Sequence, residues 1–260
     1  MKLTFFQVDA FAERLFKGNP AAVIPLTRWL DDETMQLIAM ENNLPETAFF
    51  VASEDGFEVR WFTPKAEVNL CGHATLASAH VIFTEHKDPR NEITFQSKSG
   101  PLRVTKKNDL LQLDFPVDVV RPVDAPNLII QALGKIPEAC YKGKTDYMLV
   151  FETEKEILDM NPNFNTLMKV KTRGTIVTAP GKTVDFVSRF FAPAVGVDED
   201  PVTGSSHTML TPYWAKRLGK SELTAHQLSK RGGELLVSMN NNRVLIAGKT
   251  KTFLRGEIVI

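Results

Sequence analysis

The chain has 260 residues, and its 31 Lys and Arg balance 31 Asp and Glu, so the formal net charge is zero. We do not expect nucleic-acid binding, because it needs a surface rich in basic residues that neutralises phosphates. The composition, 43% hydrophobic and 24% charged, is typical of a packed globular protein and argues against disorder.

No apolar run approaches the roughly 20 residues that span a bilayer, so no membrane association is expected. Asp9 and Glu13 interrupt the first apolar run before a signal-peptide core could form. Cys71 and Cys140 are the only cysteines, too few for a disulfide scaffold. We therefore predict a cytoplasmic location.

The first half of the chain is predicted to be rich in strands. The expected strands are 3–8, 21–24, 47–51, 58–62, 93–96, 102–105 and 110–115. Between the second and third lies a predicted helix, 31–43, which Asp31 caps. Its predicted apolar face consists of Met35, Leu37, Ile38 and Met40.

A second helix, over residues 74–83, is apolar on nearly every side. Such a helix has no solvent face and must be enclosed, and in a soluble chain the flanking strands are the natural enclosure. The sequence therefore predicts a sheet curved around a central helix.

The second half is predicted to repeat this arrangement after a proline-containing linker at 116–126. Its expected strands are 147–152, 175–178, 184–191, 235–239, 244–247 and 256–260. Its expected central helix is 205–218, stopped by Gly219 and buried through Met209, Leu210, Tyr213, Trp214 and Leu218. Pro212 predicts that this helix either kinks or begins near Thr211.

A repeated motif supports duplication. Arg60-Trp61-Phe62-Thr63-Pro64 precedes Cys71-Gly72-His73, and Arg189-Phe190-Phe191-Ala192-Pro193 precedes Thr203-Gly204-Ser205. The predicted domains are accordingly 1–117, with a central helix at 73–86, and 118–260, with a central helix at 205–219. This domain prediction leaves open whether the final strand returns to the first half.

Each predicted helix starts at a glycine turn, Gly72-His73 or Gly204-Ser205. A helix start offers unsatisfied backbone amides and the positive end of the helix dipole. Between the two halves these groups would bind a carboxylate, and glycine lets the ligand approach the backbone closely.

Several stretches together resemble the phenazine biosynthesis PhzF-like family. They are Val8-Asp9-Ala10-Phe11, Phe16-Lys17-Gly18-Asn19-Pro20-Ala21-Ala22-Val23, Glu46-Thr47-Ala48-Phe49, the two motifs above, and Glu199-Asp200-Pro201-Val202-Thr203-Gly204-Ser205. The resemblance implies an α+β, diaminopimelate epimerase-like fold: two pseudo-symmetric halves, each a rolled, mostly antiparallel sheet around a central helix. It also implies an active site between the halves, a homodimer, and an isomerase.

By this resemblance Glu46 is the residue that shuttles the proton, and His73 and Asp200 line the same pocket. Moving a proton between carbons needs one group that acts as base and then as acid, which suits a partly buried carboxyl. Asn19, Gly72, Gly204 and Ser205 are assigned to substrate binding, although Ser205 could equally cap its helix. The expected reaction is a proton shift in a small carboxylate-bearing metabolite.

Cys71 leaves other mechanisms open. Epimerases and racemases of this fold pair two thiols, but no cysteine stands near Thr203, and a hydroxyl is too weak a base to replace one. The helix start is expected to lower the pKa of Cys71 and make it reactive. A thiol hydrolase using Cys71 and His73 is an alternative, opposed by the expectation that these near neighbours point apart. A non-catalytic binding protein is another.

No metal and no cofactor are predicted. The histidines show no metal-ligand spacing with cysteines or carboxylates, and the chain has no phosphate-binding glycine-rich signature.

Overall fold

The computed structural model describes all residues, 1–260, and divides them into two compact units. Unit 1 comprises residues 1–114 and 247–260, and unit 2 comprises residues 115–246. The chain leaves unit 1 within β8 (Leu110–Pro116) and re-enters it at the end of β16 (Arg243–Gly248). None of the helices is long and apolar enough to cross a membrane.

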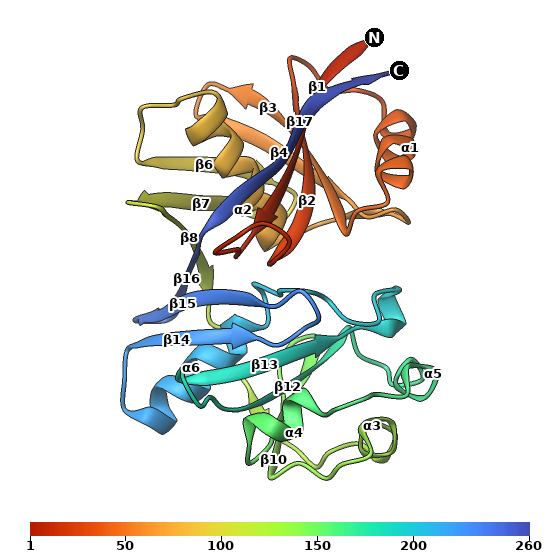
Figure 1. Cartoon of the computed structure of the whole chain (residues 1–260), viewed down its shortest axis with the longest axis vertical. Helices are drawn as coiled ribbons and strands as arrows, with labels where there is room; N and C mark the ends of the chain where they lie inside the picture. Colours follow the sequence, from red (N-terminus) through yellow and green to blue (C-terminus); the bar gives the residue numbers. More distant parts are fainter. The chain divides into compact units, whose positions relative to one another are not determined.

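Unit 1 is a sheet of strands with mixed directions (Figure 1). Its strands are β1 (Lys2–Ala10), β2 (Asn19–Leu26), β3 (Glu46–Ser53), β4 (Gly56–Phe62), β5 (Glu67–Val68), β6 (Glu92–Ser97), β7 (Gly100–Lys107), β8 and β17 (Thr250–Val259). The pairs β2–β3 and β4–β6 are parallel, and the others, including β1–β2, β3–β4 and β6–β7, are antiparallel. The last strand, β17, pairs with β1, so the chain end completes unit 1.

Unit 2 repeats this order of pairings. Its strands are β9 (Arg121–Pro122), β10 (Ala139–Lys142), β11 (Asp146–Val150), β12 (Gly174–Pro180), β13 (Phe186–Phe191), β14 (Glu222–Gln227), β15 (Gly233–Asn240) and β16. Here β11–β12 and β13–β14 are parallel, whereas β10–β11, β12–β13 and β14–β15 are antiparallel. The matching sequence of parallel and antiparallel pairs supports the duplication inferred from the repeated motif.

The predicted enclosed helix of unit 1 is present as α2 (Gly72–His80), continued by the π-helical turn η1 (Val81–Glu85). Every residue from His73 to Ala79 is buried, and Leu76 and Ile82 have no exposed surface. The helix packs against β1, β2 and β3, as its apolar circumference predicts. This confirms the predicted fold class for unit 1.

The central helix of unit 2 is α6 (His207–Leu218), and it differs from the prediction at Pro212. It begins at His207 and runs through the proline. Proline has no amide hydrogen to donate to the carbonyl of Thr208, four residues earlier. That carbonyl instead accepts a hydrogen bond from the Asp118 backbone amide at 3.2 Å. Leu218 is 38% exposed, so it does not belong to the enclosed face, and Gly219 ends the helix with φ +66°.

The surface helices also sharpen the prediction. α1 (Asp32–Asn42) is capped by Asp31, whose side chain accepts from the Thr34 amide, as expected. Met35 and Ile38 are buried, but Leu37 and Met40 are 56% and 52% exposed, so two members of the predicted apolar face are wrong. The short helices α3 (Asn127–Leu133), α4 (Glu154–Leu158) and α5 (Phe164–Leu167) of unit 2 were not predicted.

Segment 116–126 is part of unit 2 rather than an open linker. The Val117 amide donates to the Asn242 carbonyl, and the Val123 amide donates to the Cys140 carbonyl. Strand β9 within it pairs with β10. Its prolines exclude a helix but allow a short two-residue strand.

The duplicated arginines explain part of the repeated motif. Arg60 donates from Nε and Nη2 to the two oxygens of Glu67 at 2.8 and 2.9 Å. Arg189 makes the same two-pronged contact with Glu199, at 2.7 and 2.9 Å. Each guanidinium also lies over the ring of the aromatic residue two positions on, Phe62 or Phe191. We call each arrangement an arginine fork; both brace the segment that leads from a strand to the central helix.

Candidate active site

The predicted residues of unit 1 come together at the start of α2. Glu46 is the first residue of β3, Asn19 is the first residue of β2, and Cys71 and His73 flank the helix start at Gly72. We call Asn19, Glu46, Cys71 and His73 the α2 cluster. Gly18, with φ +69°, makes the turn that places Asn19, because a Cβ there would lie 2.1 Å from the Ala10 carbonyl oxygen.

Glu46 and His73 form the central contact of the α2 cluster. Glu46 Oε2 lies 3.0 Å from His73 Nε2, and the two side chains are 18% and 6% exposed. The two atoms lie at hydrogen-bonding distance, and the contact becomes an ion pair when the His73 ring is protonated.

The other ring nitrogen of His73 is held from within the protein. Nδ1 lies 3.2 Å from Asn19 Nδ2 and 3.5 Å from Cys71 Sγ. When the Asn19 amide donates to Nδ1, the neutral ring carries its proton on Nε2, next to Glu46. Protonation of Nδ1 as well would require Asn19 to present its oxygen.

Charge, rather than burial, sets the direction of the His73 pKa. Burial alone lowers the pKa of a histidine, but the charge of Glu46 and the polar contacts with Cys71 and Glu46 raise the pKa of His73 well above its usual 6.5. The α2 cluster is therefore a place where a proton is retained.

Two expectations about Cys71 are wrong. Burial, together with the charge of Glu46, raises the pKa of the Cys71 thiol, so the helix start does not make it a reactive thiolate. Its sulfur also lies near His73 Nδ1 rather than pointing away. The start of α2 places both side chains on one side, which spacing along the sequence could not reveal.

Glu46, Cys71 and His73 also form a set of possible metal ligands, whose ligand atoms all lie within 4.8 Å of one another. The arrangement does not suit a single ion, because Cys71 approaches Nδ1 of the imidazole and Glu46 approaches Nε2. An ion bound by an imidazole lies in line with one ring nitrogen. We therefore derive no metal chemistry from this set.

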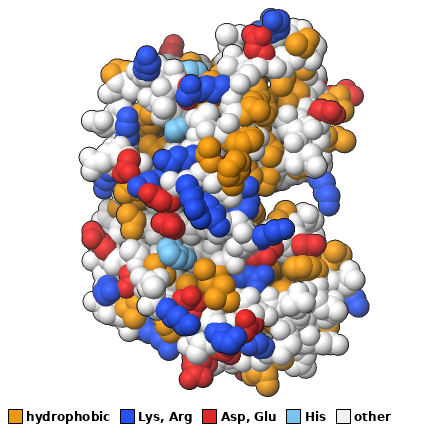
Figure 2. Space-filling model, in the orientation of Figure 1, with side chains coloured by type: hydrophobic (Ala, Val, Ile, Leu, Met, Phe, Trp, Pro, Cys, Tyr) orange, Lys and Arg blue, Asp and Glu red, His pale blue; other side chains and the backbone are white.

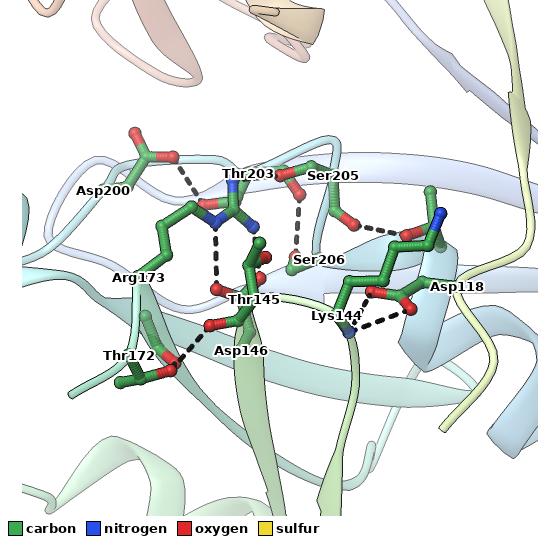
Figure 3. Close-up of polar contacts among 12 residues, drawn as sticks. Asp118, Lys144, Thr145, Asp146, Thr172, Arg173, Asp200, Thr203, Ser205 and Ser206 are labelled. Carbon is green, nitrogen blue, oxygen red and sulfur yellow. Dashed lines mark hydrogen bonds and ion pairs between the residues drawn. The ribbon is translucent and has the colours of Figure 1, made fainter. Parts of the chain in front are cut away.

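The predicted residues of unit 2 lie around the start of α6 (Figure 3). The Thr203 hydroxyl donates to Asp200 Oδ2 at 2.5 Å, and the buried Gln227 bonds both the Thr203 amide and the Asp200 carbonyl. These contacts fix the turn that leads through Gly204 to Ser205.

Arg173 is a residue of this region that the sequence interpretation missed. It donates from Nη1 to Ser205 Oγ at 3.0 Å and from Nε to Asp146 Oδ1 at 2.9 Å, and its Nη2 also bonds Asp146 (Figure 3). Although burial lowers the pKa of Arg173, the hydrogen bonds and charge of Asp146 raise it overall. The Asp146 side chain is only 2% exposed, so the carboxylate of this ion pair is buried and depends on Arg173 for its partner charge.

Strand register relates Arg173 to Glu46. Thr47 pairs with Phe62 in unit 1, and Thr175 pairs with Phe191 in unit 2, so Gly174 occupies the position of Glu46. A Cβ at Gly174 would lie 2.2 Å from the Phe190 ring, which excludes a side chain there. Aligning the halves on their repeated arginines, 129 residues apart, would place Thr175 opposite Glu46, so the strand register, rather than this spacing, identifies Gly174 and the adjacent Arg173.

The duplicated α+β architecture is that of the diaminopimelate epimerase-like proteins. A family model described as phenazine biosynthesis-like protein, PhzC-PhzF, matches residues 8–256. The chain therefore belongs to the phenazine biosynthesis-like (PhzF) family.

Individual relatives agree with this. An uncharacterized isomerase of Pseudomonas aeruginosa is 51% identical over 259 residues, covering 99% of both chains. The crystal structure of a PhzF-family phenazine biosynthesis protein from Enterococcus faecalis is 45% identical and covers 100% of both chains, with a TM-score of 0.97. A predicted epimerase from Pseudomonas aeruginosa, with a TM-score of 0.76 at 20% identity over 99% of both chains, shows the shared fold. The names of the relatives support the expected enzyme class, an isomerase.

Proposed function

We propose that the chain catalyses a cofactor-independent proton shift in a small carboxylate-bearing metabolite, with Glu46 as the acid and base. The observation that carries the proposal is the Glu46–His73 contact of 3.0 Å in the largely buried α2 cluster. Glu46 would remove a proton from one substrate carbon as a carboxylate and return it to another carbon as a carboxylic acid. His73, held by Asn19, would keep the carboxyl oriented.

Unit 2 contains a candidate carboxylate-binding element. Ser205 Oγ accepts from Arg173, so its own hydroxyl proton is directed away from the guanidinium and is available to donate. We propose that Ser205 and the Gly204 turn bind a substrate carboxylate, and that Asp200 shapes this turn through Thr203. Gly72 and Asn19 retain their proposed roles in substrate binding.

The test is hydrogen exchange in D2O, with a panel of small α-amino, cyclic and unsaturated carboxylates followed by proton NMR. We expect the wild-type protein to exchange one C–H signal of a substrate. Glu46→Gln should slow that exchange by roughly 10²- to 10⁴-fold, because it removes the acid and base. Glu41→Gln, on the exposed side of α1, is the matched control. Exchange that survives in Glu46→Gln would contradict the proposal.

A thiol hydrolase is the second candidate, favoured by the 3.5 Å contact between Cys71 Sγ and His73 Nδ1. The raised pKa of Cys71 opposes it, because the thiolate is the nucleophile. Cys71→Ala separates the two: the isomerase should keep most of its exchange activity, whereas a thiol hydrolase would lose all activity. A binding protein without turnover would show neither exchange nor hydrolysis.

We also propose a homodimer, built on the exposed apolar side chains beside β17. Phe16 and Phe253 pack edge to face and are 68% and 45% exposed, and Leu254 is 40% exposed. Figure 2 shows hydrophobic side chains gathered over the upper part of this face, where Figure 1 draws β1 and β17. Sedimentation analysis should find a dimer that Phe16→Asp with Phe253→Asp converts to monomers; a wild-type monomer would contradict this.

A further inference from the structure

A concave site lies in unit 1, at the other end of the central helix from the α2 cluster. It has a volume of about 200 Å³, opens to solvent, and is lined by α2 and η1, the β7–β8 hairpin, and the segment that enters β17. The lining residues are His80, Phe83, Thr84, Lys106, Asn108, Asp109, Leu111, Lys249, Thr250 and Lys251. We call this hollow the lysine pocket. None of its residues takes part in the proposed proton transfer.

The charge of the lysine pocket is strongly one-sided. Three lysines line it against a single carboxylate, Asp109. Asp109 is bound to Lys249 at 3.0 Å, and Lys249 is also bound to Glu13 at 2.8 Å. Lys106 and Lys251 have no carboxylate partner among the ion pairs of the unit. Their charges are therefore available to a ligand.

Neighbouring acidic and basic groups do not cancel this charge. Glu85, on η1, is engaged by Arg255 at 2.7 Å and also accepts from the Thr252 hydroxyl. His80, at the base of the pocket, has both ring nitrogens bonded, to the hydroxyls of Thr250 at 2.7 Å and Thr252 at 2.8 Å. Burial, with Arg255, Lys251 and Lys106 acting in the same direction, lowers the pKa of His80 to about 4. The histidine is thus a neutral support that fixes two threonines, and the lysines carry the positive field.

The pocket also offers neutral donors and an apolar wall. The Thr84 hydroxyl and the Asn108 amide line it, and Asn108 is held at the hairpin turn with φ +57°. Phe83 and Leu111 form an apolar part of the wall, and Lys106 Nζ lies 5.7 Å from the centre of the Phe83 ring. The site therefore combines point charges with hydroxyl and amide donors around a space large enough for a small ligand.

We infer that the lysine pocket binds a phosphate-type oxyanion, either free phosphate or the phosphoryl group of a small metabolite. Lysines are strongly hydrated point charges that suit a compact dianion, whereas planar carboxylates are matched best by the fork of an arginine, and no arginine lines the pocket. Lys106 and Lys251 would carry the charge recognition. Thr84 and Asn108 would donate to the remaining oxygens.

Binding is tested by calorimetric titration of the full chain at low ionic strength with inorganic phosphate, pyrophosphate and glycerol 3-phosphate. Amide shifts of Thr84, Asn108 and Thr250 in NMR spectra locate the site. We expect saturable binding that moves these amides and weakens as salt is added. Tighter binding of glycerol 3-phosphate than of phosphate would assign the pocket to a phosphorylated metabolite, and the reverse order to the free anion. Absence of saturable shifts up to about 10 mM of all three ligands would overturn the inference.

Variants make the test specific. Lys106→Gln and Lys251→Gln should each weaken binding by about five- to tenfold, which corresponds to about 1 kcal/mol. Lys107→Gln is the matched control, because Lys107 is the next residue along β7, alternates to the other face, and contacts Gln112 instead. Asp109→Asn should tighten binding, since it removes the only carboxylate of the pocket.

Two results would contradict the assignment even if an anion bound. Equal weakening by Lys107→Gln would mean a general charge effect without a site. Equal affinity for succinate, a dianion whose charges are spread over two carboxylates, would mean that the pocket has no preference for phosphate. The binding assays need no turnover, so their outcome is independent of the proposed isomerase activity.

Discussion

The starts of the two central helices show how one framework supports different chemistry. At α2, Glu46 and His73 form a contact between groups that can exchange a proton. At α6, the place of Glu46 is taken by Gly174, and the adjacent Arg173 joins Asp146 to Ser205. The two units share the strand order and the arginine forks, whereas their helix starts differ: one holds the Glu46–His73 contact and the other holds an arginine paired with an aspartate.

The largest difference between the two units is expected in how completely their central helices are enclosed. Leu76 in α2 is fully buried, whereas Leu218 in α6 is 38% exposed. We expect Leu76→Ala to lower the free energy of unfolding by about 4 kcal/mol, because it leaves a cavity, and Leu218→Ala to lower it by less than about 1 kcal/mol. Urea unfolding of both variants measures the difference. Similar losses would mean that α2 is not enclosed as described.

The next largest effect on stability is expected from breaking the Arg173–Asp146 ion pair of unit 2. Arg173→Met leaves the buried Asp146 without its cation and should lower the free energy of unfolding by about 3 kcal/mol. This is the lower end for such pairs, because the Arg173 side chain is 37% exposed. Arg173→Met combined with Asp146→Asn should cost less than Arg173→Met alone. Chemical unfolding of the single and double variants tests this; additive losses would argue against a coupled pair.

The pKa values of the histidines near the two helix starts are expected to shift in opposite directions. His73 has a raised pKa, so its contribution to stability is fully present below pH 6.5 and is lost as pH rises through its folded pKa. Burial lowers the pKa of His207 to about 4, so its contribution is present above pH 6.5 and is lost, up to about 3 kcal/mol, as pH falls toward 4. NMR titration of the ring signals should show His73 charged and His207 neutral at pH 6.5. The reverse order would refute the description of the α2 cluster.

Much of the fold could be predicted because its signals are local. Alternating apolar residues located the strands of unit 1, and the apolar circumference of residues 74–83 required an enclosed helix. Strand β14 was missed although its buried residues alternate, because Thr224 and His226 make its other face polar. Pro212 suggested a break that a tertiary hydrogen bond to Thr208 removed.

The candidate site was predictable only as far as its motifs reached. The family resemblance grouped Glu46 and His73, and the structure brings them into contact. The proximity of Cys71 to His73 depends on side-chain rotamers at a helix start, which sequence spacing does not determine. Arg173 stands outside every motif, and its partner Asp146 lies on a separate strand, so only the strand register reveals its place.

The arginine forks offer the finest comparison between the units. Arg189 also donates to the carbonyls of Ile157 and Met160, and its side chain is 11% exposed, whereas the third contact of Arg60 is to the exposed Asp32. Lysine cannot make the two-pronged contact with a carboxylate. Arg189→Lys should therefore lower the free energy of unfolding by about 2 kcal/mol, and Arg60→Lys by about 1 kcal/mol.

The two losses would be read from urea unfolding, with acid unfolding as an independent check on the smaller one. Arg60, through its hydrogen bonds, holds the pKa of Glu67 at about 2, compared with its usual 4.5. The stabilisation from Glu67 is therefore present above pH 4.5 and lost as pH falls toward 2, and Arg60→Lys should flatten this dependence. Equal losses in the two variants would mean that the backbone contacts of Arg189 add nothing, and that the forks stabilise their units to the same extent.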